Sequence, residues 1–368
     1  MTTGTMRKEN KILIISAKGI GNSVGLVKIL NYLDMSNVHY DLVLRNNGSE
    51  SVLRAFGVKN IDRVLLWDEK NGKLNALLSL IEQIRKQYYN LAVATYPSGA
   101  KEVIMLRFAR AKHKKILRNK GGFFKFAQFL FPAKPMADPK IHEFEHNASM
   151  LGVPIRFLRQ KKVKLGGSLE KIIGFHIGSK GISKRWHPDK WRELARKIVS
   201  IHNAKFYIIA GPDEAEIAKQ VEENFPAPYT PLIGLKFPEL IEIMNTFSIL
   251  IGNDSSIAHI AATLGIPTVV IWAYSDYYRI SPYGKGVYVI TRNYSCIPCY
   301  QVTKGYVESC KYNFKCIRNT TSSEVFAIVN QILESDNLPD FSNAKGISNL
   351  CEVMTLDNGS QIIKFCDE

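Results

Sequence analysis

The chain has 368 residues, of which 46% are hydrophobic and 22% charged, a composition typical of globular proteins. This length predicts about two domains, and there is ample chain to bury a core. The apolar runs are short and interrupted, which excludes a transmembrane helix of roughly 18 residues.

The formal net charge of +16 favours anionic partners such as nucleic acid, anionic lipid or a phosphorylated substrate. No zinc-finger helix, basic zipper or RNA-binding aromatic motif accompanies this charge, so we expect no nucleic-acid partner. The amino-terminal sequence MTTGTMRKENKILII lacks the long apolar stretch and the small-residue cleavage site of a signal peptide. We therefore expect a cytoplasmic protein.

The first part of the chain alternates strand-like and helix-like patterns. Apolar runs predict strands at 11–16, 40–45, 64–67 and 91–96, and helical spacing of apolar residues predicts helices at 24–33 and 73–87. Such alternation predicts a parallel sheet covered by helices on both faces. We assign it to a first domain, residues 10–158.

A polar, basic and glycine-containing linker at 159–170 precedes a second domain at 171–335. Here the pattern restarts, with strands predicted at 172–178 and 205–211 and helices at 189–203, 212–225 and 237–247. The predicted fold class is α/β, with two doubly wound parallel sheets and an interdomain cleft. Ligands of such sheets bind outside the carboxyl ends of the strands.

The segment SILIGNDSSIAHIAATLGIPTVVIW, residues 248–272, forms the next predicted β–α–β unit. Asp254 occupies the expected N-cap position, Ser255 and Ser256 open the helix, and His259 follows one turn later. A diphosphate at this helix end would meet backbone N–H groups, hydroxyls and an imidazole. A simple helix cap with a structural histidine fits the same residues, so both interpretations stay open at this point.

Five segments in chain order resemble motifs of the heptosyltransferases, family 9 of the glycosyltransferases. GNDSSIAHIAATLGIPTVVIW resembles their Asp-Ser-Gly-Pro-x-His-x-Ala-Ala-x-x-Gly-x-Pro segment, and KILIISAKGIGNSVGLVKILNYL resembles their amino-terminal strand and Gly-Asp loop. The other three are IHEFEHNASMLGVP, HIGSKGISKRWHPDKWRELA and IIAGPDEAE. The likeness spans residues 11–330 and implies the GT-B arrangement of two Rossmann-like domains, with the acceptor bound by the first and a nucleotide sugar by the second.

The resemblance implies a nucleotide-sugar donor, typically ADP-heptose, and inverting transfer that needs no metal. Lys184 matches the family's phosphate-contacting lysine, which neutralises charge on the leaving nucleotide; a solvated lysine in a basic loop is the alternative. The other residues expected around the donor are Ser255, Ser256 and His259 at the diphosphate, Asp254 ordering the loop, Glu214 or Glu216 at the ribose, and Leu235 near the adenine. For each glutamate the alternative is an exposed acid at a helix start.

The match fails at the position of the general base. Inverting transfer needs a base for the acceptor hydroxyl, and the family places an aspartate where this chain has Asn22. Three explanations stay open. In the first, Asn22 orients the acceptor and another acid, such as Asp138 or Glu143, serves as base. In the second the chain is a natural variant with weak activity or a binding role, and in the third Asn22 is an engineered replacement of aspartate. Ser256 also replaces the usual glycine, which narrows the diphosphate pocket slightly.

The stretch 111–137, AKHKKILRNKGGFFKFAQFLFPAKPMA, has seven Lys or Arg, five Phe and no acid. Such a segment is suited to an anionic membrane surface, with rings buried and lysines at the headgroups. We therefore expect a peripheral location on the inner face of the cytoplasmic membrane and a lipid-linked, anionic glycan acceptor. The alternative is that the phenylalanines pack into the first domain and the lysines are merely solvated.

Four cysteines follow a C-x2-C-x10-C-x5-C pattern in the segment 296–316: Cys296, Cys299, Cys310 and Cys316. In a reducing cytoplasm this spacing favours a structural tetrathiolate site for zinc or iron over disulfides. Reduced free thiols are the alternative.

The tail, residues 336–368, contains CEVMTLDNGSQIIKFC, which predicts a β-hairpin with its turn at Asn358 and Gly359. That register brings Cys351 opposite Cys366. A disulfide between them would need an oxidising setting.

The function expected from these features is heptosyl, or related glycosyl, transfer to a lipopolysaccharide core or other surface glycan. A transferase with a different donor, such as a UDP-sugar, is a second candidate. A catalytically silent paralogue that binds a nucleotide sugar or glycan is the third, and Asn22 is the residue that favours it.

Overall fold

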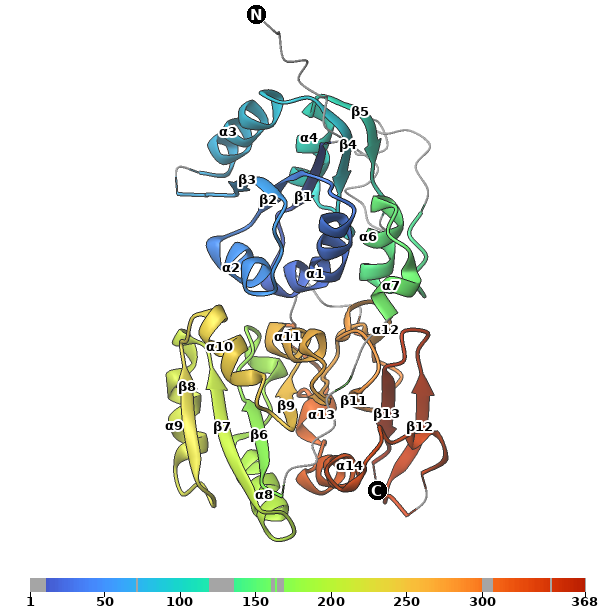
Figure 1. Cartoon of the computed structure of the whole chain (residues 1–368). Coiled ribbons are helices and arrows are strands. Elements are labelled where there is room, and N and C mark those ends of the chain that lie inside the picture. Colours follow the sequence, from blue (N-terminus) through green and yellow to red (C-terminus); the bar gives the residue numbers. More distant parts are fainter. Residues whose placement is uncertain are drawn as a thin grey trace, which may run out of the picture. The chain divides into compact units, whose positions relative to one another are not determined.

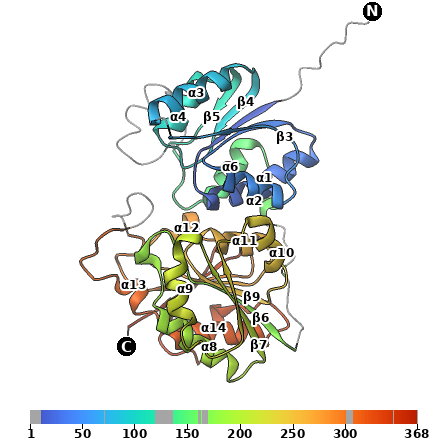
Figure 2. The same cartoon turned by 90° about the vertical axis from the view of Figure 1, so that its left-hand side faces the viewer.

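The computed structural model describes residues 11–70, 72–118, 136–159, 163, 169–299, 307–344 and 346–367 (Figure 1). The chain divides into two compact units, Met1–Leu158 and Arg159–Glu368. Each unit is a Rossmann-like α/β layer structure, with helices flanking a predominantly parallel sheet (Figure 2). Within the described ranges, no helix is long and apolar enough to cross a bilayer.

The amino-terminal unit contains a five-stranded parallel sheet in the order β3-β2-β1-β4-β5. Its strands are β1 (Ile12–Ser16), β2 (Tyr40–Leu44), β3 (Ile61–Leu66), β4 (Tyr89–Ala94) and β5 (Ala111–Lys115). Its helices are α1 (Ile20–Met35), α2 (Asn47–Ala55), α3 (Lys73–Arg85), α4 (Ala100–Phe108), α6 (Glu143–Leu151) and α7 (Ile155–Arg159). The four predicted strands are confirmed. The edge strand β5 was not predicted, because its sequence AKHKK has no apolar alternation and none of its residues is fully buried.

Helices α3 and α4 pack together on one face of this sheet, and α1 contacts α2 and α6 on the other (Figure 1). The close approach of α6 to α1 depends on Gly25, because a Cβ there would lie 1.9 Å from the ring of Phe144. This contact fixes the amino-terminal end of α6 beside the first turns of α1. It therefore determines which side chains meet near Asn22.

The carboxyl-terminal unit contains an eight-stranded sheet in the order β12-β13-β11-β10-β9-β6-β7-β8. Its strands are β6 (Lys171–His176), β7 (Ala204–Ala210), β8 (Tyr229–Ile233), β9 (Ile249–Asn253), β10 (Thr268–Ile271), β11 (Val287–Arg292), β12 (Leu350–Thr355) and β13 (Gln361–Phe365). Its helices are α8 (Pro188–Val199), α9 (Ala215–Glu222), α10 (Phe237–Met244), α11 (Ser256–Leu264), α12 (Tyr277–Ile280), α13 (Lys315–Arg318) and α14 (Ser322–Glu334), with 3-10 turns η1 (Ile182–Lys184), η2 (Pro212–Glu214) and η3 (Phe341–Asn343). All neighbouring strands are parallel except β12 and β13.

Helices α8, α9 and α14 share one apolar core with the central strands. In this core Trp191 of α8 is fully buried, and its ring meets that of Trp186 edge to face at a centroid distance of 5.1 Å. Trp186 belongs to the loop between β6 and α8, so the core holds that loop firmly in place. The loop carries Lys184.

The carboxyl-terminal tail contributes two strands to the main sheet, because β13 pairs in parallel with β11 (Figure 1). The predicted hairpin exists, but its predicted register is wrong by one residue: Glu352 pairs with Lys364, not with Phe365. A β-bulge between Leu350 and Glu352 takes up the difference. Because Cys351 lies in this bulge, it still comes beside Cys366, as predicted.

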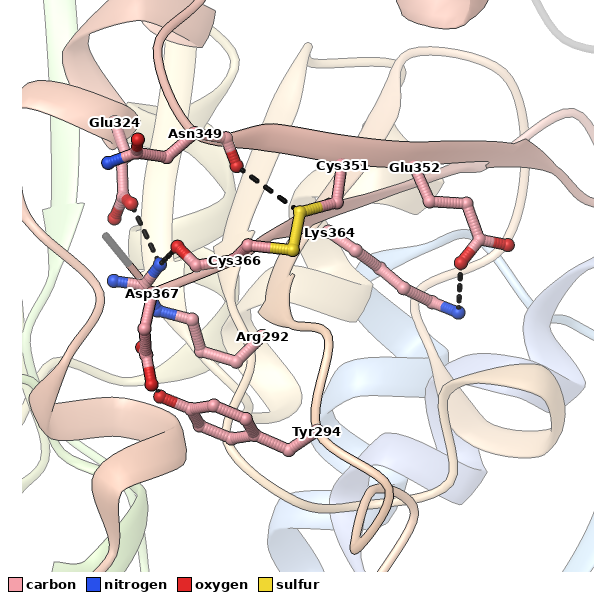
Figure 3. Close-up of a disulfide and its surroundings, with 9 residues drawn as sticks. All are labelled: Arg292, Tyr294, Glu324, Asn349, Cys351, Glu352, Lys364, Cys366 and Asp367. Carbon is pink, nitrogen blue, oxygen red and sulfur yellow. Dashed lines mark hydrogen bonds and ion pairs between the residues drawn. A yellow bond between two sulfur atoms is a disulfide. The ribbon is translucent and has the colours of Figure 1, made fainter.

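Cys351 and Cys366 form a disulfide with a Cα–Cα distance of 5.8 Å (Figure 3). Around it, the buried Arg292 donates to the carbonyl of Cys366 at 2.8 Å and to the Glu324 carboxylate at 2.8 Å. Lys364 pairs with Glu352 across the hairpin at 2.8 Å. The chain end is therefore tied to the sheet by polar contacts as well as by the disulfide.

The disulfide closes a loop with a sequence separation of 15 residues. Restricting the unfolded chain over such a loop is worth up to about 3 kcal/mol. We expect the oxidised protein to unfold several degrees above the reduced protein in thermal melts followed by circular dichroism. The double variant Cys351→Ser/Cys366→Ser should melt at one temperature with or without reductant, and a redox-dependent shift that persists in it would contradict this assignment.

Candidate functional site

The carboxyl ends of β6 and β9 form the candidate donor site of the second unit. The two strands are parallel neighbours, and His176 at the end of β6 pairs with Gly252 of β9. The loop after β6 and the amino-terminal end of α11 therefore start from the same edge of the sheet.

Asn253, the last residue of β9, holds the loop after β6 against this edge. It is fully buried; its side-chain oxygen accepts from the Trp186 amide at 3.1 Å and its side-chain nitrogen donates to the Ile177 carbonyl at 2.7 Å. Asn253 was not predicted as a site residue. Its signal in the sequence is a polar amide at the end of an otherwise apolar strand.

Lys184 and Asp254 form an ion pair in the interior of the site. The Lys184 ammonium lies 2.5 Å from an Asp254 carboxylate oxygen, and the two residues are only 8% and 9% exposed. The same oxygen accepts from the Ser275 hydroxyl at 2.8 Å. Lys184 is therefore not the solvated lysine considered as its alternative.

Helix α11 is capped by Ser255, so the prediction of Asp254 as N-cap is wrong. The Ser255 hydroxyl accepts from the Ile257 amide at 3.3 Å and contacts Nδ1 of His176 at 2.9 Å. Asp254 is instead turned toward Lys184, since an ammonium group compensates a buried carboxylate better than a backbone amide does. Ser256 follows as the first residue of the helix.

The two histidines of this region are held neutral. Burial lowers the pKa of His176 to about 4, against the opposing effect of the Glu214 carboxylate. Burial also lowers the pKa of His259 to about 4, with Asp254 opposing and Lys184 assisting the shift. At neutral pH the histidines therefore add no charge to the site, Asp254 compensates the Lys184 ammonium, and the amino-terminal end of α11 supplies a positive potential.

The structure separates the two glutamates considered for the ribose. Glu214 lies at the site: it accepts from the Gly211 amide at 2.8 Å and from Arg185 at 3.3 Å. Its carboxylate fills the space beside Gly178, where a Cβ would come within 1.7 Å of it. Glu216 is exposed on α9, where Gln220 donates to it at 3.5 Å. Leu235 is half-buried between β8 and α10.

In the first unit, Asn22 lies in the first turn of α1 and donates to the Glu143 carboxylate at 3.5 Å. Glu143 is 3% exposed at the start of α6. Asp138, the other acid considered, is exposed, and its carboxylate accepts from the Lys140 amide at 2.8 Å. Glu143 is therefore the acid that the fold brings to Asn22.

The four cysteines of the segment 296–316 come together around one cavity of about 250 Å³. All four are free thiols, and burial raises the pKa of Cys316 to about 12, with the nearby Cys310 and Cys296 adding to the shift. In the part of the chain that the structure describes, no group of three or more His, Cys, Asp or Glu side chains is arranged to hold a metal ion. Metal binding by these thiols stays a prediction. The phenylalanines of the stretch 111–137 lie outside the described residues.

Comparison with known families decides the assignment of the fold. The family model described as glycosyltransferase family 9 (heptosyltransferase) matches residues 35–308. The chain belongs to this family. It is thus a glycosyltransferase of the heptosyltransferase type, and its two Rossmann-like units are those of the GT-B fold.

Two heptosyltransferases and a further family 9 glycosyltransferase resemble this chain along most of its length. A lipopolysaccharide heptosyltransferase 1 of Campylobacter coli is 24% identical over 306 residues, which cover 73% of this chain and 85% of that protein. The crystal structure of a family 9 glycosyltransferase of Veillonella parvula has a TM-score of 0.69 at 19% identity and covers 89% of this chain and 98% of its own. The E. coli heptosyltransferase WaaC with ADP has a TM-score of 0.65 at 16% identity and covers 88% and 99%.

The low pKa values of His176 and His259 predict acid sensitivity of this family 9 chain. Unfolded histidines take up protons near pH 6.5, whereas these two do so in the folded state only near pH 4. Their contribution to stability is complete above about pH 6.5 and is lost as the pH falls toward 4, because only the unfolded state gains protons in that window. Between pH 7 and 5 we expect a loss of about 1–2 kcal/mol per histidine in urea unfolding.

The variants His176→Gln and His259→Gln should each flatten this pH dependence. His113, which is exposed on β5, provides the control: His113→Gln should shift stability equally at both pH values. A wild-type chain as stable at pH 5 as at pH 7 would contradict the buried, neutral state of the two histidines.

Proposed function

We propose that the chain transfers heptose, or a related sugar, from ADP-heptose to a lipopolysaccharide core or other surface-glycan acceptor, with inversion at the anomeric carbon. The observation that carries this proposal is the buried Lys184–Asp254 pair beside the capped end of α11. The names of the relatives support the same donor and acceptor, since one is a lipopolysaccharide heptosyltransferase and another was solved with ADP.

In the proposed reaction, Lys184 compensates the charge that develops on the departing diphosphate. The ammonium group is already oriented by Asp254 and desolvated, so little reorganisation is needed as charge builds up. The first amides of α11 and the hydroxyls of Ser255 and Ser256 complete an anion site of the kind found at helix starts. Protein groups thus supply the positive charge for metal-independent transfer.

Glu214 is the proposed partner of the ribose hydroxyls, and Leu235 of the adenine. Arg185 pairs with one oxygen of the Glu214 carboxylate. The other oxygen of Glu214 accepts from the Gly211 amide. A carboxylate fixed in this way offers its remaining lone pairs to hydroxyl groups. A uridine donor would place a smaller base against Leu235, so the nucleotide-release assay below, run with ADP-heptose and with UDP-sugars, separates the two cases.

Glu143 is the proposed general base. Asn22 has no basic group at neutral pH, but its amide donates to the Glu143 carboxylate and can orient it. Packing of Phe144 against Gly25 keeps Glu143 in this position. Asn22 then positions Glu143, and Glu143 acts as the general base in place of the family's aspartate.

The acceptor is proposed to be anionic and membrane-linked. Lys18, Arg45 and Lys101 follow strands of the first sheet at its carboxyl edge, where Lys18 pairs with Glu102 at 3.5 Å. Burial lowers the pKa of Lys101 against the opposing effect of Glu102, and Lys18 and Arg45 add to the shift. Such a group of cations attracts phosphate- or carboxylate-bearing glycans. The basic aromatic stretch 111–137 supports a peripheral position on the cytoplasmic membrane from its sequence alone.

The proposal also includes a structural zinc or iron bound by Cys296, Cys299, Cys310 and Cys316. Its support is their spacing and their common cavity, and either metal accepts four thiolates in a tetrahedron. Such an ion would hold the segment together. Elemental analysis of the purified chain decides between bound metal and free thiols.

Nucleotide release tests the proposed function. We expect turnover with ADP-heptose and a lipopolysaccharide-core acceptor, and little with UDP- or GDP-sugars. Lys184→Met should lower kcat/KM by about a hundredfold or more, whereas the exposed Arg196→Met should not change it. Binding of ADP-heptose without turnover on any core acceptor would favour the silent paralogue, and turnover with a UDP-sugar alone would overturn the donor.

The assignment of the base predicts unequal effects of two substitutions. Glu143→Gln should lower kcat by about 10²- to 10⁴-fold with little change in KM for the donor, because it removes a proton acceptor of nearly the same shape. Asn22→Ala should cost less, since the carboxylate remains. The measurement is steady-state kinetics across pH 5–9. A Glu143→Gln enzyme with wild-type kcat would contradict this role.

A further inference from the structure

A second pocket of the carboxyl-terminal unit lies between the loop after β6 and the segment 307–318. It encloses about 800 Å³, within the range of small-molecule sites. One wall is formed by residues of the loop after β6 and by Lys190 of α8, and the other by Val307, Glu308 and residues around α13.

Basic side chains dominate the lining of this pocket. Lys180, Arg185, Lys190 and Arg318 contribute four positive charges, and Glu308 is the only acid among the lining residues. Cations gathered around one cavity at this ratio attract an anion.

Two of the four basic side chains are available to a ligand. Arg185 is engaged with Glu214 and the Ser179 carbonyl, and Lys190 donates to the carbonyls of Arg318 and Thr320. Lys180 and Arg318 are exposed, and neither side chain has a hydrogen bond or ion pair with another described residue. These two side chains can therefore turn to an anion at the pocket mouth.

Apolar side chains form another part of the lining, beside the polar Ser183, His187 and Asn313. Ile182 is 78% exposed at the mouth, and Val307, Phe314 and Ile317 line the same cavity. Basic groups next to an apolar and aromatic surface suit a ligand with an anionic substituent on a compact ring. In a glycosyltransferase, that description fits a sugar carrying a phosphate or carboxylate.

This pocket is separate from the candidate donor site. None of Glu214, Leu235, Asp254, Ser255, Ser256 and His259 lines it. The two sites share only the loop: Lys184 points to Asp254, while Ser183 contacts the Val307 carbonyl at 2.8 Å and the Tyr274 hydroxyl at 2.8 Å.

We propose that this pocket is a second binding site, for a phosphate- or carboxylate-bearing sugar, in which Lys180 and Arg318 hold the anionic group and Phe314 and Ile182 contact the ring. This inference goes beyond the proposed transfer reaction, since the four residues assigned to the ligand have no role in that reaction; Arg185, which holds Glu214, is the one lining residue that the two sites share. An anionic unit of a glycan chain is the class of ligand that it would take.

Calorimetric titration of the full chain tests the site, with glucose 6-phosphate and glucuronate as the two anionic probes. Glucose and inorganic phosphate are the controls for the separate ring and anion. Each titration is run with and without saturating ADP. We expect at least one of the anionic sugars to bind saturably in the presence of ADP, and more tightly than glucose or inorganic phosphate.

The charge-reversal variant Lys180→Glu/Arg318→Glu should weaken that binding at least tenfold while its thermal midpoint stays at the wild-type value. The matched control Arg196→Glu/Lys219→Glu changes net charge equally at exposed positions outside the pocket and should leave binding within twofold. Binding that ADP abolishes, that survives charge reversal, or that inorganic phosphate equals would overturn the proposal. The sugar titration is also run without ADP. A chain that fails to bind ADP would therefore contradict the proposed function, while binding of the anionic sugars to the second pocket could still be measured.

Discussion

The ion pair between Lys184 and Asp254 is the interaction on which the donor site depends. Two buried opposite charges 2.5 Å apart are stable only when both are present, because removing one leaves the other buried without a partner. Asn253 and Trp186 hold the loop of Lys184 in place, while Asp254 starts from the end of a central strand. The lysine is thus already desolvated in the folded chain, before any ligand binds.

The residues around the pair preserve its arrangement of charges. His176 and His259 stay neutral because burial opposes their protonation, and Ser255 rather than Asp254 caps α11. The positive helix end and the ammonium therefore remain directed at one region, and an anion there meets preorganised donors. Glu214 lies at the same site, where Arg185 and the Gly211 amide compensate the charge of its carboxylate.

The α/β class, the family and most of the strands could be predicted from the sequence, because apolar runs and loop motifs are local signals. The strands β5, β8 and β11 were not predicted. The sequence could not decide which residue caps α11, since Asp and Ser cap equally well and the choice depends on Lys184, which lies 70 positions away. The proximity of Glu143 to Asn22, 121 positions apart, likewise depends on packing of Phe144 at Gly25. The hairpin was predictable from its turn, but its bulge and its pairing with β11 depend on the neighbouring strand.

Calorimetric titration with ADP across a double-variant cycle of Lys184→Met and Asp254→Asn tests the central claim most directly. If Asp254 acts by holding the lysine, each single change should weaken ADP binding by about tenfold to a hundredfold, and the double variant should bind no more weakly than Lys184→Met alone. Losses that simply add, or a Lys184→Met chain that binds ADP as tightly as the wild type, would contradict the account of this pair as the diphosphate site.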